Sequence, residues 1–458
     1  MELTSAIYFS FLSVTIIFSL LSAGFLVTFF LEKNFRALCR GFLIFVPTAA
    51  ILFALLFSEI FLKFEILTTI VLLALFFDVA MLVRLPSPAI RINKSQQERV
   101  DERDAFFHRF YYLREEMPEF KTYYETHPEK KEIDDAIRAL PDLGEAGSRS
   151  YHAINSLFQT ATFDIIGRFN RSAHFFPEKK SDFPGSVSSL EMTQRIKGYA
   201  HYLGADLVGV TKLNPAYIYS HNARGEGDWG APIELNHKFA IALAVEMKSE
   251  MISHAPDVAV TTESSLRYMD TAKIALILAR FISLLGYEAR AHIDGNYRVM
   301  CIPVAADAGL GELGRLGLLV TPQYGSRVRI SVVTSNLPLV PDEPITFGVQ
   351  HFCEICKKCA QNCPSASISS EDKKWVKGVK KWQSQQESCY RFWRLQGSDC
   401  SVCINECPYS YPSTLMHNLM RSFVKNNNFS RRMIYWGDRI FYGKKNKSSF
   451  PLPQWHKK

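Results

Sequence analysis

The sequence predicts a membrane-anchored protein with an α/β or α+β core and a small cysteine-rich domain near its C-terminus. Three observations support this: a long apolar stretch at the N-terminus, alternating helix and strand patterns in mid-chain, and eight of the ten cysteines in two tight groups. The 458 residues are enough for two or three domains. The net charge of +8 is mild and dispersed, so no nucleic-acid partner is predicted.

Three apolar runs predict three transmembrane helices. Ala6–Leu31 carries no charge and is long enough to cross a bilayer with some tilt. Gly41–Ser58 and Ile66–Val83 follow, the last with one acid, Asp78. A cleaved signal peptide would have a basic start and a single shorter apolar segment, and this chain begins with "MELTSA". Asp78 either marks an ion or quinone path or lies near the edge of the bilayer.

The distribution of lysine and arginine predicts the orientation of these helices. One side of the membrane receives seven basic residues from the first loop and the stretch after the third run: Lys33, Arg36, Arg40, Arg84, Arg91, Lys94 and Arg99. The opposite side receives only Lys63. Basic loops stay in the cytoplasm, so the large soluble part is expected to face the cytoplasm from the inner membrane.

The soluble part shows alternating patterns. Residues 179–189 have the composition of a linker, and a capping box at Ser188 and Glu191 then starts a helix. Apolar runs at 205–213, 239–247 and 328–339 predict strands, and 268–287 predicts a long helix. This alternation indicates a sheet covered by helices.

The spacing of the clustered cysteines is typical of two 4Fe-4S clusters. In "CEICKKCAQNCP" the first three cysteines would hold one cluster and the fourth, before proline, would reach the other. The second group, "CSVCINECP", lacks one ligand, and a cysteine eleven residues upstream supplies it. The ligands expected for cluster 1 are Cys353, Cys356, Cys359 and Cys407; those for cluster 2 are Cys363, Cys389, Cys400 and Cys403.

A zinc site is the alternative for the clustered cysteines. A zinc ribbon needs four ligands and would leave four of these cysteines unused. Cys39 and Cys301 lie outside both groups, and ordinary packing is expected for them. Paired clusters pass electrons, so a second centre that uses the electrons is expected upstream.

Gly309, Gly311 and Gly314 spell GxGxxG, which alone is a weak dinucleotide signal. No acidic residue follows at the ribose-binding distance, where the chain reads "TPQYGSRVRISVV". We therefore expect these glycines to let the backbone approach another bulky cofactor.

Four features stand out: the stretch "IPVAADAGLGELGRLGLLVTPQYGSRVRISVVTSNLPLVP", the two cysteine groups, "GADLVGVTKLNP" and "YWGDRIFYG". In these features and their order the chain resembles the reductive dehalogenase family. The resemblance covers Ser189 to Gly443. It implies an oxidoreductase with a nitroreductase-like α/β core that binds cobalamin base-off, for which Gly309, Gly311 and Gly314 are the candidate contacts. It also implies a ferredoxin-like domain with two 4Fe-4S clusters, and an organohalide as the small-molecule substrate.

The resemblance also implies the site residues. Tyr268, placed just before the long helix, is expected to donate the proton that replaces the halogen. Its anion needs a nearby cation, and Arg327 is nominated, with Arg329 as the second choice. Asn296 is expected to line the substrate pocket, and so is Trp393.

The resulting domain prediction has five parts: a membrane anchor at 1–90, a helical and aromatic segment with a linker at 91–187, the corrinoid-binding core at 188–345, the double-cluster domain at 346–420, and a tail packed on the core at 421–458. The expected partners are the lipid bilayer and an electron donor, which could be a quinol, a ferredoxin or a flavoprotein. No twin-arginine export signal precedes the first run, unlike in respiratory family members.

Two rival functions share this architecture in part. Epoxyqueuosine reductases also join a corrinoid core to two clusters, but they act on tRNA and are soluble. The membrane helices and the "CYRFW" insertion argue against that assignment. An electron carrier without its own catalysis would bind iron but no cobalt. The identity of the substrate is not predicted.

Overall fold

A computed structural model describes residues 2–57, 64–85, 98–171, 174–179, 187–224, 228–447 and 450–456. Contacts divide the chain into two compact units. The first contains Met1–Ala89, Thr346–Lys358 and Tyr411–Pro451, and the second contains Ile90–Ile345, Cys359–Ser410 and Leu452–Lys458. The domain boundaries expected from the sequence stay predictions.

The first unit is helical. Its elements are α1 (Glu2–Leu31), α2 (Phe35–Phe57), α3 (Phe64–Leu82), α12 (Val349–Cys356), α16 (Leu415–Val424) and α17 (Asn428–Phe441). Among the described residues, two helices are long and apolar enough to cross a membrane, over Tyr8–Leu31 and Phe35–Leu56. The apolar stretch of α3, Thr68–Leu82, is shorter, so a third span stays a prediction. The side chain of Asp78 and residues Lys63, Arg91 and Lys94 lie outside the described residues.

A buried polar cluster joins α1 to the helices near the C-terminus. Glu32, at the end of α1, is 1% exposed. Its Oε1 lies 2.5 Å from Nε2 of His417, and its Oε2 accepts a hydrogen bond of 2.6 Å from the hydroxyl of Tyr442. The ring of Tyr442 stacks on Tyr411, whose hydroxyl accepts a hydrogen bond of 2.8 Å from Nζ of Lys358. A network of buried side chains thus leads from the apolar helices to the first cysteine group.

We expect Glu32→Ala to destabilise the first unit by about 3–5 kcal/mol, because the change leaves His417 and Tyr442 buried without their shared acceptor. Thermal unfolding of the detergent-solubilised protein measures the loss. Cys39→Ala is the control, since Cys39 is an exposed residue of the adjacent helix. A Glu32→Ala protein as stable as this control would contradict the prediction.

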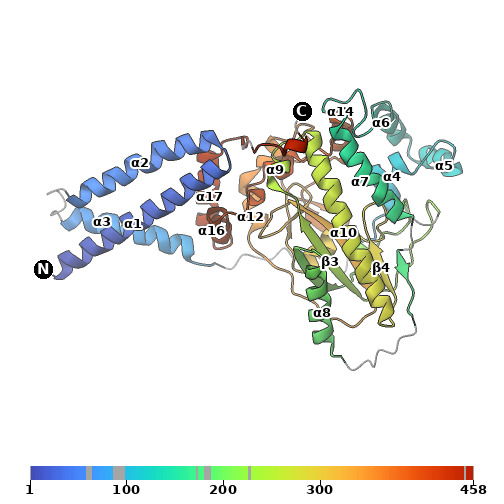
Figure 1. Ribbon diagram of the computed structural model, residues 1–458, viewed down its shortest axis with the longest axis horizontal. Helices are drawn as coiled ribbons and strands as arrows, with labels where there is room; N and C mark the ends of the chain where they lie inside the picture. The colour runs from blue at the N-terminus through green and yellow to red at the C-terminus, as the bar shows by residue number, and fades with distance from the viewer. Residues whose placement is uncertain are drawn as a thin grey trace. The chain divides into compact units, whose positions relative to one another are not determined.

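The second unit is built on a five-stranded sheet with the order β1-β4-β7-β3-β2 (Figure 1). Its strands are β1 (Phe175–Phe176), β2 (Leu207–Lys212), β3 (Phe239–Glu246), β4 (Ala289–His292) and β7 (Val328–Ser335). Every neighbouring pair is antiparallel. The core is therefore α+β, and the α/β label is corrected, because an alternating sequence pattern does not reveal strand direction.

Helices cover the sheet, and short helices carry most of the clustered cysteines. The remaining elements of this unit are α4 (Phe106–Tyr111), α5 (Pro118–Thr126), α6 (Pro128–Arg138), α7 (Asn155–Asn170), α8 (Ser189–Tyr202), α9 (Ser249–Ile252), α10 (Val258–Leu284), α11 (Cys301–Asp307), α14 (Gln386–Gln396), α15 (Val402–Asn405), β5 (Glu312–Leu313), β6 (Leu319–Val320), β8 (Lys374–Val376) and β9 (Val379–Lys381). Helix α13 (Lys358–Gln361) starts at the last residue of the first unit.

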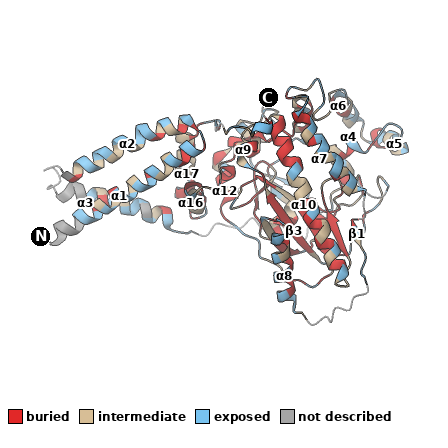
Figure 2. Ribbon diagram, viewed as in Figure 1, coloured by how far each residue is buried: buried red, intermediate tan, exposed pale blue. Residues whose placement is uncertain are grey.

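Strand β3 shows how the sequence specifies the two faces of the sheet. Its large residues Ile241, Leu243 and Val245 pack with α8 and α10, while Ala240, Ala242 and Ala244 face α11. This follows from the two-residue period of a strand. Figure 2 shows the buried sheet beneath α8 and α10. Strand β2 also packs closely on this face of the sheet. A Cβ on Gly209 would lie 2.1 Å from the carbonyl oxygen of Ala308, so only glycine fits there.

The helix signals in the sequence are confirmed in part. Ser188 caps α8, and its hydroxyl accepts a hydrogen bond from the backbone N–H of Glu191. Helix α10 begins ten residues earlier than predicted, at Val258, after the cap residue Asp257. Tyr268 therefore lies within the helix and not before it. The β-branched residues in "VAVTT" concealed this first part of α10, because such residues are typical of strands.

Candidate active site

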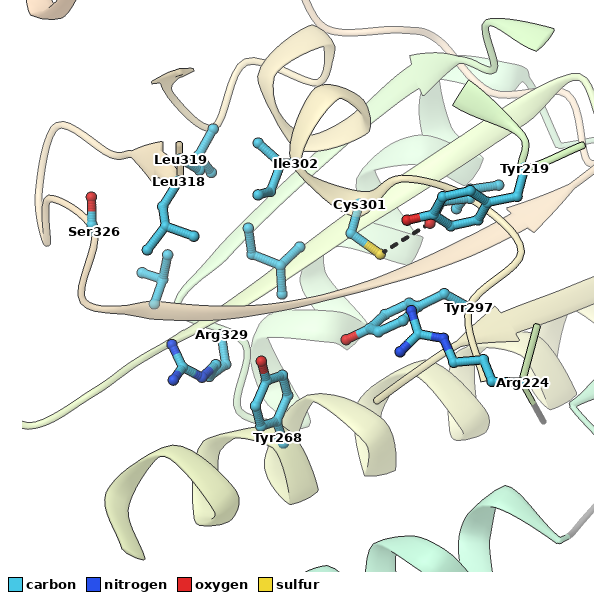
Figure 3. A pocket seen from close by; sticks show the side chains of 13 residues that line it. Tyr219, Arg224, Tyr268, Tyr297, Cys301, Ile302, Leu318, Leu319, Ser326 and Arg329 are labelled. Carbon is cyan, nitrogen blue, oxygen red and sulfur yellow. Dashed lines mark hydrogen bonds between the residues drawn. The ribbon is translucent and has the colours of Figure 1, made fainter. Parts of the chain in front are cut away.

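A pocket of about 220 Å³ lies between α10 and β7 in the second unit (Figure 3). Tyr268 extends into it from α10, and Arg329 extends into it from β7. Across from Tyr268 the wall is apolar and contains Ile302, Leu318 and Leu319. One wall is thus apolar and the other carries phenol and guanidinium groups, as in sites that orient a ligand with a few polar contacts.

Tyr268 and Arg329 are directly in contact. The guanidinium of Arg329 lies 4.9 Å from the centre of the Tyr268 ring. Burial raises the pKa of Tyr268 to about 12, although the positive charge of Arg329 lowers it. The phenol is therefore protonated at neutral pH, and it lines the pocket. It can offer its proton to a bound molecule.

Asp399 fixes Arg329 in this position. Its Oδ2 accepts hydrogen bonds of 3.0 Å from Nη2 of Arg329 and 2.6 Å from the hydroxyl of Ser264. The hydroxyl of Thr261 donates to Oδ1 and accepts from the backbone N–H of Asp399. Asp399 directly precedes Cys400, so one short segment contacts both the pocket arginine and the second cysteine group.

Arg327 does not take the position predicted for it. Its Nη1 donates to Oε1 of Glu246 at 2.7 Å and to the carbonyl of Met247, and its Nε donates to the carbonyl of Ser410. Arg329, the second choice from the sequence, therefore lies beside Tyr268, and Arg327, the first choice, does not. Strand β7 begins at Val328, so Arg327 lies in the preceding turn and lacks the side-chain direction of the strand.

Two other predicted pocket residues lie elsewhere. Asn296 is fully buried and its Oδ1 accepts a hydrogen bond of 2.8 Å from Arg290, so it is not part of the pocket lining. The next residue, Tyr297, lines the pocket instead. Trp393 packs against Phe107 and lies beside Cys389. Burial raises the pKa of Cys389 to about 11, although the Trp393 side chain lowers it by hydrogen bonding to the sulfur.

The three predicted cofactor glycines contact the chain itself. A Cβ on Gly311 would lie 2.2 Å from the carbonyl oxygen of Val320, and one on Gly309 would lie 2.7 Å from that of Glu343. At Gly314 the nearest atom is a methyl of Val320, at 2.7 Å. The close approach that requires glycine is thus to β6 and a nearby loop. These glycines also follow α11, whereas a dinucleotide fingerprint precedes a helix.

The far end of the pocket was not predicted from the sequence. Arg224 and Tyr297 meet there, with the guanidinium 4.5 Å from the ring centre, and Tyr219 and Cys301 lie beside them (Figure 3). Nε of Arg224 donates to the buried carboxylate of Glu102 at 2.9 Å. These four residues come from two short segments, 219–224 and 297–301, and no spacing rule links one segment to the other.

The four cysteines expected at cluster 2 lie together in the second unit. Burial raises the pKa of Cys403, and Cys400, Cys389, Cys363 and also Cys407 act on it electrostatically in the same direction. Burial would also raise the pKa of Cys363, but the hydroxyl of Ser365 and three backbone N–H groups lower it overall. Hydrogen bonds of this kind stabilise a thiolate, which is the form that binds iron.

The backbone repeats between the two cysteine groups. In each, the residue after the second cysteine is left-handed, with φ of 51° at both Lys357 and Ser401. A four-residue helix then carries the third cysteine, α13 in one group and α15 in the other. The first cysteine of each set is also helical, Cys353 on α12 and Cys389 on α14. This correspondence supports Cys389 as the displaced ligand.

The cluster 1 cysteines divide between the units: Cys353 and Cys356 belong to the first unit, and Cys359 and Cys407 to the second. Within the described residues, no three His, Cys, Asp or Glu side chains are close enough to share one metal ion. A 4Fe-4S cluster bonds each cysteine to a different iron and so spaces its ligands more widely than zinc does.

The pocket residues fit one face of a corrinoid. The apolar wall matches the face of a macrocycle, and the buried hydroxyl of Ser326 has no hydrogen-bond partner in the described residues. A buried polar atom without a partner indicates a bond to a group that the chain does not supply. A whole corrinoid is larger than this pocket, so it would border the cavity rather than fill it.

Comparisons with known proteins agree with this architecture. Residues 352–411 match the 4Fe-4S dicluster domain family. The chain is 30% identical over 297 residues to the tetrachloroethene reductive dehalogenase of Sulfurospirillum multivorans, which covers 57% of this chain and 59% of that protein. It is 35% identical over 235 residues to a tetrachloroethene reductive dehalogenase of Desulfitobacterium hafniense, covering 49% of this chain and 42% of that one.

A solved structure shows the same fold. The catabolic reductive dehalogenase NpRdhA, in complex with 3-bromo-4-hydroxybenzoic acid, superposes with a TM-score of 0.63 and 25% sequence identity. The match covers 79% of this chain and 49% of that one. The chain thus spans about half of the length of these relatives.

Proposed function

We propose that this chain is a member of the reductive dehalogenase family, a membrane-anchored enzyme that replaces the halogen of an organohalide with hydrogen. The observation that carries the proposal is the pair of Tyr268 and Arg329, which lines a pocket and is tied through Asp399 to the second cysteine group. A proton donor and an electron supply are the two requirements of reductive dehalogenation.

The proposed cofactors are cobalamin and two 4Fe-4S clusters. When bound, the corrinoid supplies the reduced cobalt centre that cleaves carbon–halogen bonds, and the clusters supply its electrons. Ile302, Leu318 and Leu319 would contact the corrinoid, and Ser326 would bond to its polar edge. Eight cysteines would hold the clusters: Cys353, Cys356, Cys359 and Cys407 for the first, and Cys363, Cys389, Cys400 and Cys403 for the second.

Within this proposal Tyr268 donates a proton from its hydroxyl to the carbon that loses the halogen. Arg329 stabilises the phenolate that remains, because a cation beside the ring favours the charged form. Asp399 and Ser264 hold the guanidinium in place, so Arg329 need not reorient when the charge develops. Burial excludes water and strengthens this interaction.

We further propose that α1 and α2 cross the inner membrane and that the second unit faces the cytoplasm. The apolar lengths of both helices and the positive charge of Lys33, Arg36 and Arg40 in their connecting segment support this. A third span by α3 would add to the anchor.

Arg329→Met is expected to lower turnover about 10²–10³-fold, because the phenolate of Tyr268 loses its neighbouring cation. Arg329→Lys retains the charge and should recover part of the rate. Halide release, measured per cluster-loaded enzyme, tests both variants. Unchanged turnover in Arg329→Met would show that another group stabilises the phenolate.

The overall proposal is tested by anaerobic purification with cobalamin supplied. We expect about eight irons and one cobalt per chain, corrin absorbance, and halide release driven by a reduced viologen dye. Protein that holds its full iron but no corrinoid would contradict the dehalogenase assignment and favour a plain electron carrier.

A further inference from the structure

An exposed hairpin lies between two cysteines of the second cluster set. Strands β8 and β9 pair over Lys374–Val376 and Val379–Lys381. Lys377 and Gly378 form the two-residue turn, both with positive φ, which is the geometry that matches the twist of a tight hairpin. The chain enters this hairpin after Cys363 and leaves it before Cys389.

The hairpin concentrates positive charge. Five lysines, at positions 373, 374, 377, 380 and 381, stand against the two acids Glu371 and Asp372. Lys374 pairs directly with Lys381 across the two strands, and like charges in that register destabilise a hairpin. The five lysines fall within nine residues, so the description of the charge as dispersed was wrong for this segment. A segment that only connects two cysteines does not need lysines that repel each other. The lysines therefore indicate an additional role for the hairpin.

Two of the lysines form ion pairs that are exposed to solvent. Lys374 contacts Glu371 at 2.8 Å and Lys377 contacts Asp104 at 3.7 Å, and all four side chains are more than 40% exposed. Exposed pairs of this kind contribute about 0–1 kcal/mol and are screened by salt. Trp375 is 63% exposed beside these lysines, and exposed tryptophans are enriched among residues that dominate protein interfaces.

The hairpin is held firmly to the core. Trp382, at its end, is 5% exposed, and the guanidinium of Arg315 lies 4.5 Å from the ring centre. Nη1 of Arg315 also donates to the carbonyls of Ser369 and Glu371, at 2.7 and 2.9 Å. The lysines are therefore presented on a fixed surface, which lowers the entropy lost when a partner binds.

The base of the hairpin leads to the second cluster set. At the base of the hairpin the backbone N–H of Gln385 donates a hydrogen bond to the carbonyl of Ser367. The hydroxyl of Ser367 hydrogen bonds to Ser365 and to Ser388. Ser365 contacts the sulfur of Cys363 at 3.5 Å, and Ser388 precedes Cys389. A protein bound on the hairpin would therefore be linked to two cysteines of cluster 2 by a short path of covalent and hydrogen bonds.

We propose that the hairpin Lys373–Trp382 is the docking surface for an acidic electron-carrier protein of the ferredoxin or flavodoxin class. The inference rests on the proposed function, since it assigns the electron donor of that site. In each encounter the carrier is oxidised by one electron and the second cluster is reduced by one, and no bond forms or breaks. Opposite charges accelerate such encounters by about 10–10³-fold.

The position at the cluster favours a redox protein over the other anionic partners. An anionic lipid surface or an RNA would also attract lysines, but neither requires attachment to two cluster cysteines. Both alternatives are outcomes of the experiment below.

The test uses the cluster-loaded enzyme without any organohalide. A triple variant, Lys374→Glu with Lys377→Glu and Lys380→Glu, is mixed with a reduced acidic plant-type ferredoxin, and bleaching of the iron–sulfur absorbance is followed by stopped flow. We expect the second-order rate to fall at least about tenfold and to lose its dependence on salt. Reduction by methyl viologen, which needs no docking, should stay unchanged.

A matched control changes three exposed lysines elsewhere, Lys121→Glu with Lys212→Glu and Lys238→Glu. The control alters the net charge equally and should keep most of the ferredoxin rate. An equal loss in both variants would mean that only overall charge matters, and no loss in the hairpin variant would overturn the proposal.

Binding to vesicles of anionic lipid and to tRNA is measured on the same proteins. If the hairpin variant lost either of these and kept its ferredoxin rate, the partner would be that macromolecule instead. Ferredoxin reduction of the clusters without later halide release would leave the docking surface intact while contradicting the dehalogenase function, so the two failures are distinguishable.

Discussion

Tyr268→Phe is expected to lower turnover by about 10²–10⁴-fold while iron and cobalt contents stay at the wild-type level. The substitution removes one hydroxyl and keeps the ring beneath Arg329. Because Tyr268 lines the pocket and its ring is kept, loss of the hydroxyl should not disturb the fold. Halide release and the metal contents of the same preparation measure the two effects separately.

The matched control is Tyr297→Phe, which removes another phenol hydroxyl from the same pocket (Figure 3). We expect a smaller loss there, since Tyr297 contacts Arg224 and not Arg329. An equal loss in both variants would indicate a general role of pocket polarity. Full activity in Tyr268→Phe would exclude this tyrosine as the donor.

The pH dependence follows from the position of the donor pKa. As the proposed donor, Tyr268 would have to be protonated, and burial raises its pKa to about 12. The step that it catalyses should therefore be independent of pH through the neutral range and should slow only as the pH rises toward about 12. A rate that already fell between pH 8 and 10 would point to a donor with an ordinary pKa.

The sequence predicted best where chemistry depends on local spacing. Cysteine offsets are properties of one short loop, so the iron–sulfur domain could be recognised from them, and residues 352–411 match a dicluster family. Strands β2, β3 and β7 were likewise visible from apolar runs of the right length. Strand direction was not, because antiparallel pairing depends on how distant segments return to the sheet.

Residues that meet across the fold were harder to predict. Arg327 and Arg329 are two positions apart, and a strand starting one residue earlier would have placed both on one face. The start of β7 at Val328 decides which of them reaches Tyr268. Arg224 reaches the pocket from a loop held by Glu102, and that pairing spans more than a hundred residues. A single sequence carries no signal for such contacts.

Cys389→Ala should reduce the iron content from about eight to about four per chain and abolish turnover. Cys389 lies on α14, outside the compact group formed by Cys400, Cys403 and Cys407, yet it acts electrostatically on Cys400 and Cys403. With three thiolates left, the second cluster would lose the iron at one corner and become unstable. The first cluster, which does not use Cys389, should remain and keep its EPR signal after reduction.

Cys301→Ala is the control for this prediction, since Cys301 lines the pocket and belongs to neither cysteine group. It should keep about eight irons, whatever its effect on substrate binding. If Cys389→Ala also kept eight irons, the fourth ligand would have to come from another side chain. The backbone repeat argues against that outcome, because Cys353 and Cys389 occupy helices that precede matching left-handed residues, at Lys357 and Ser401. Two loops with the same geometry should present their cysteines to their clusters in the same way.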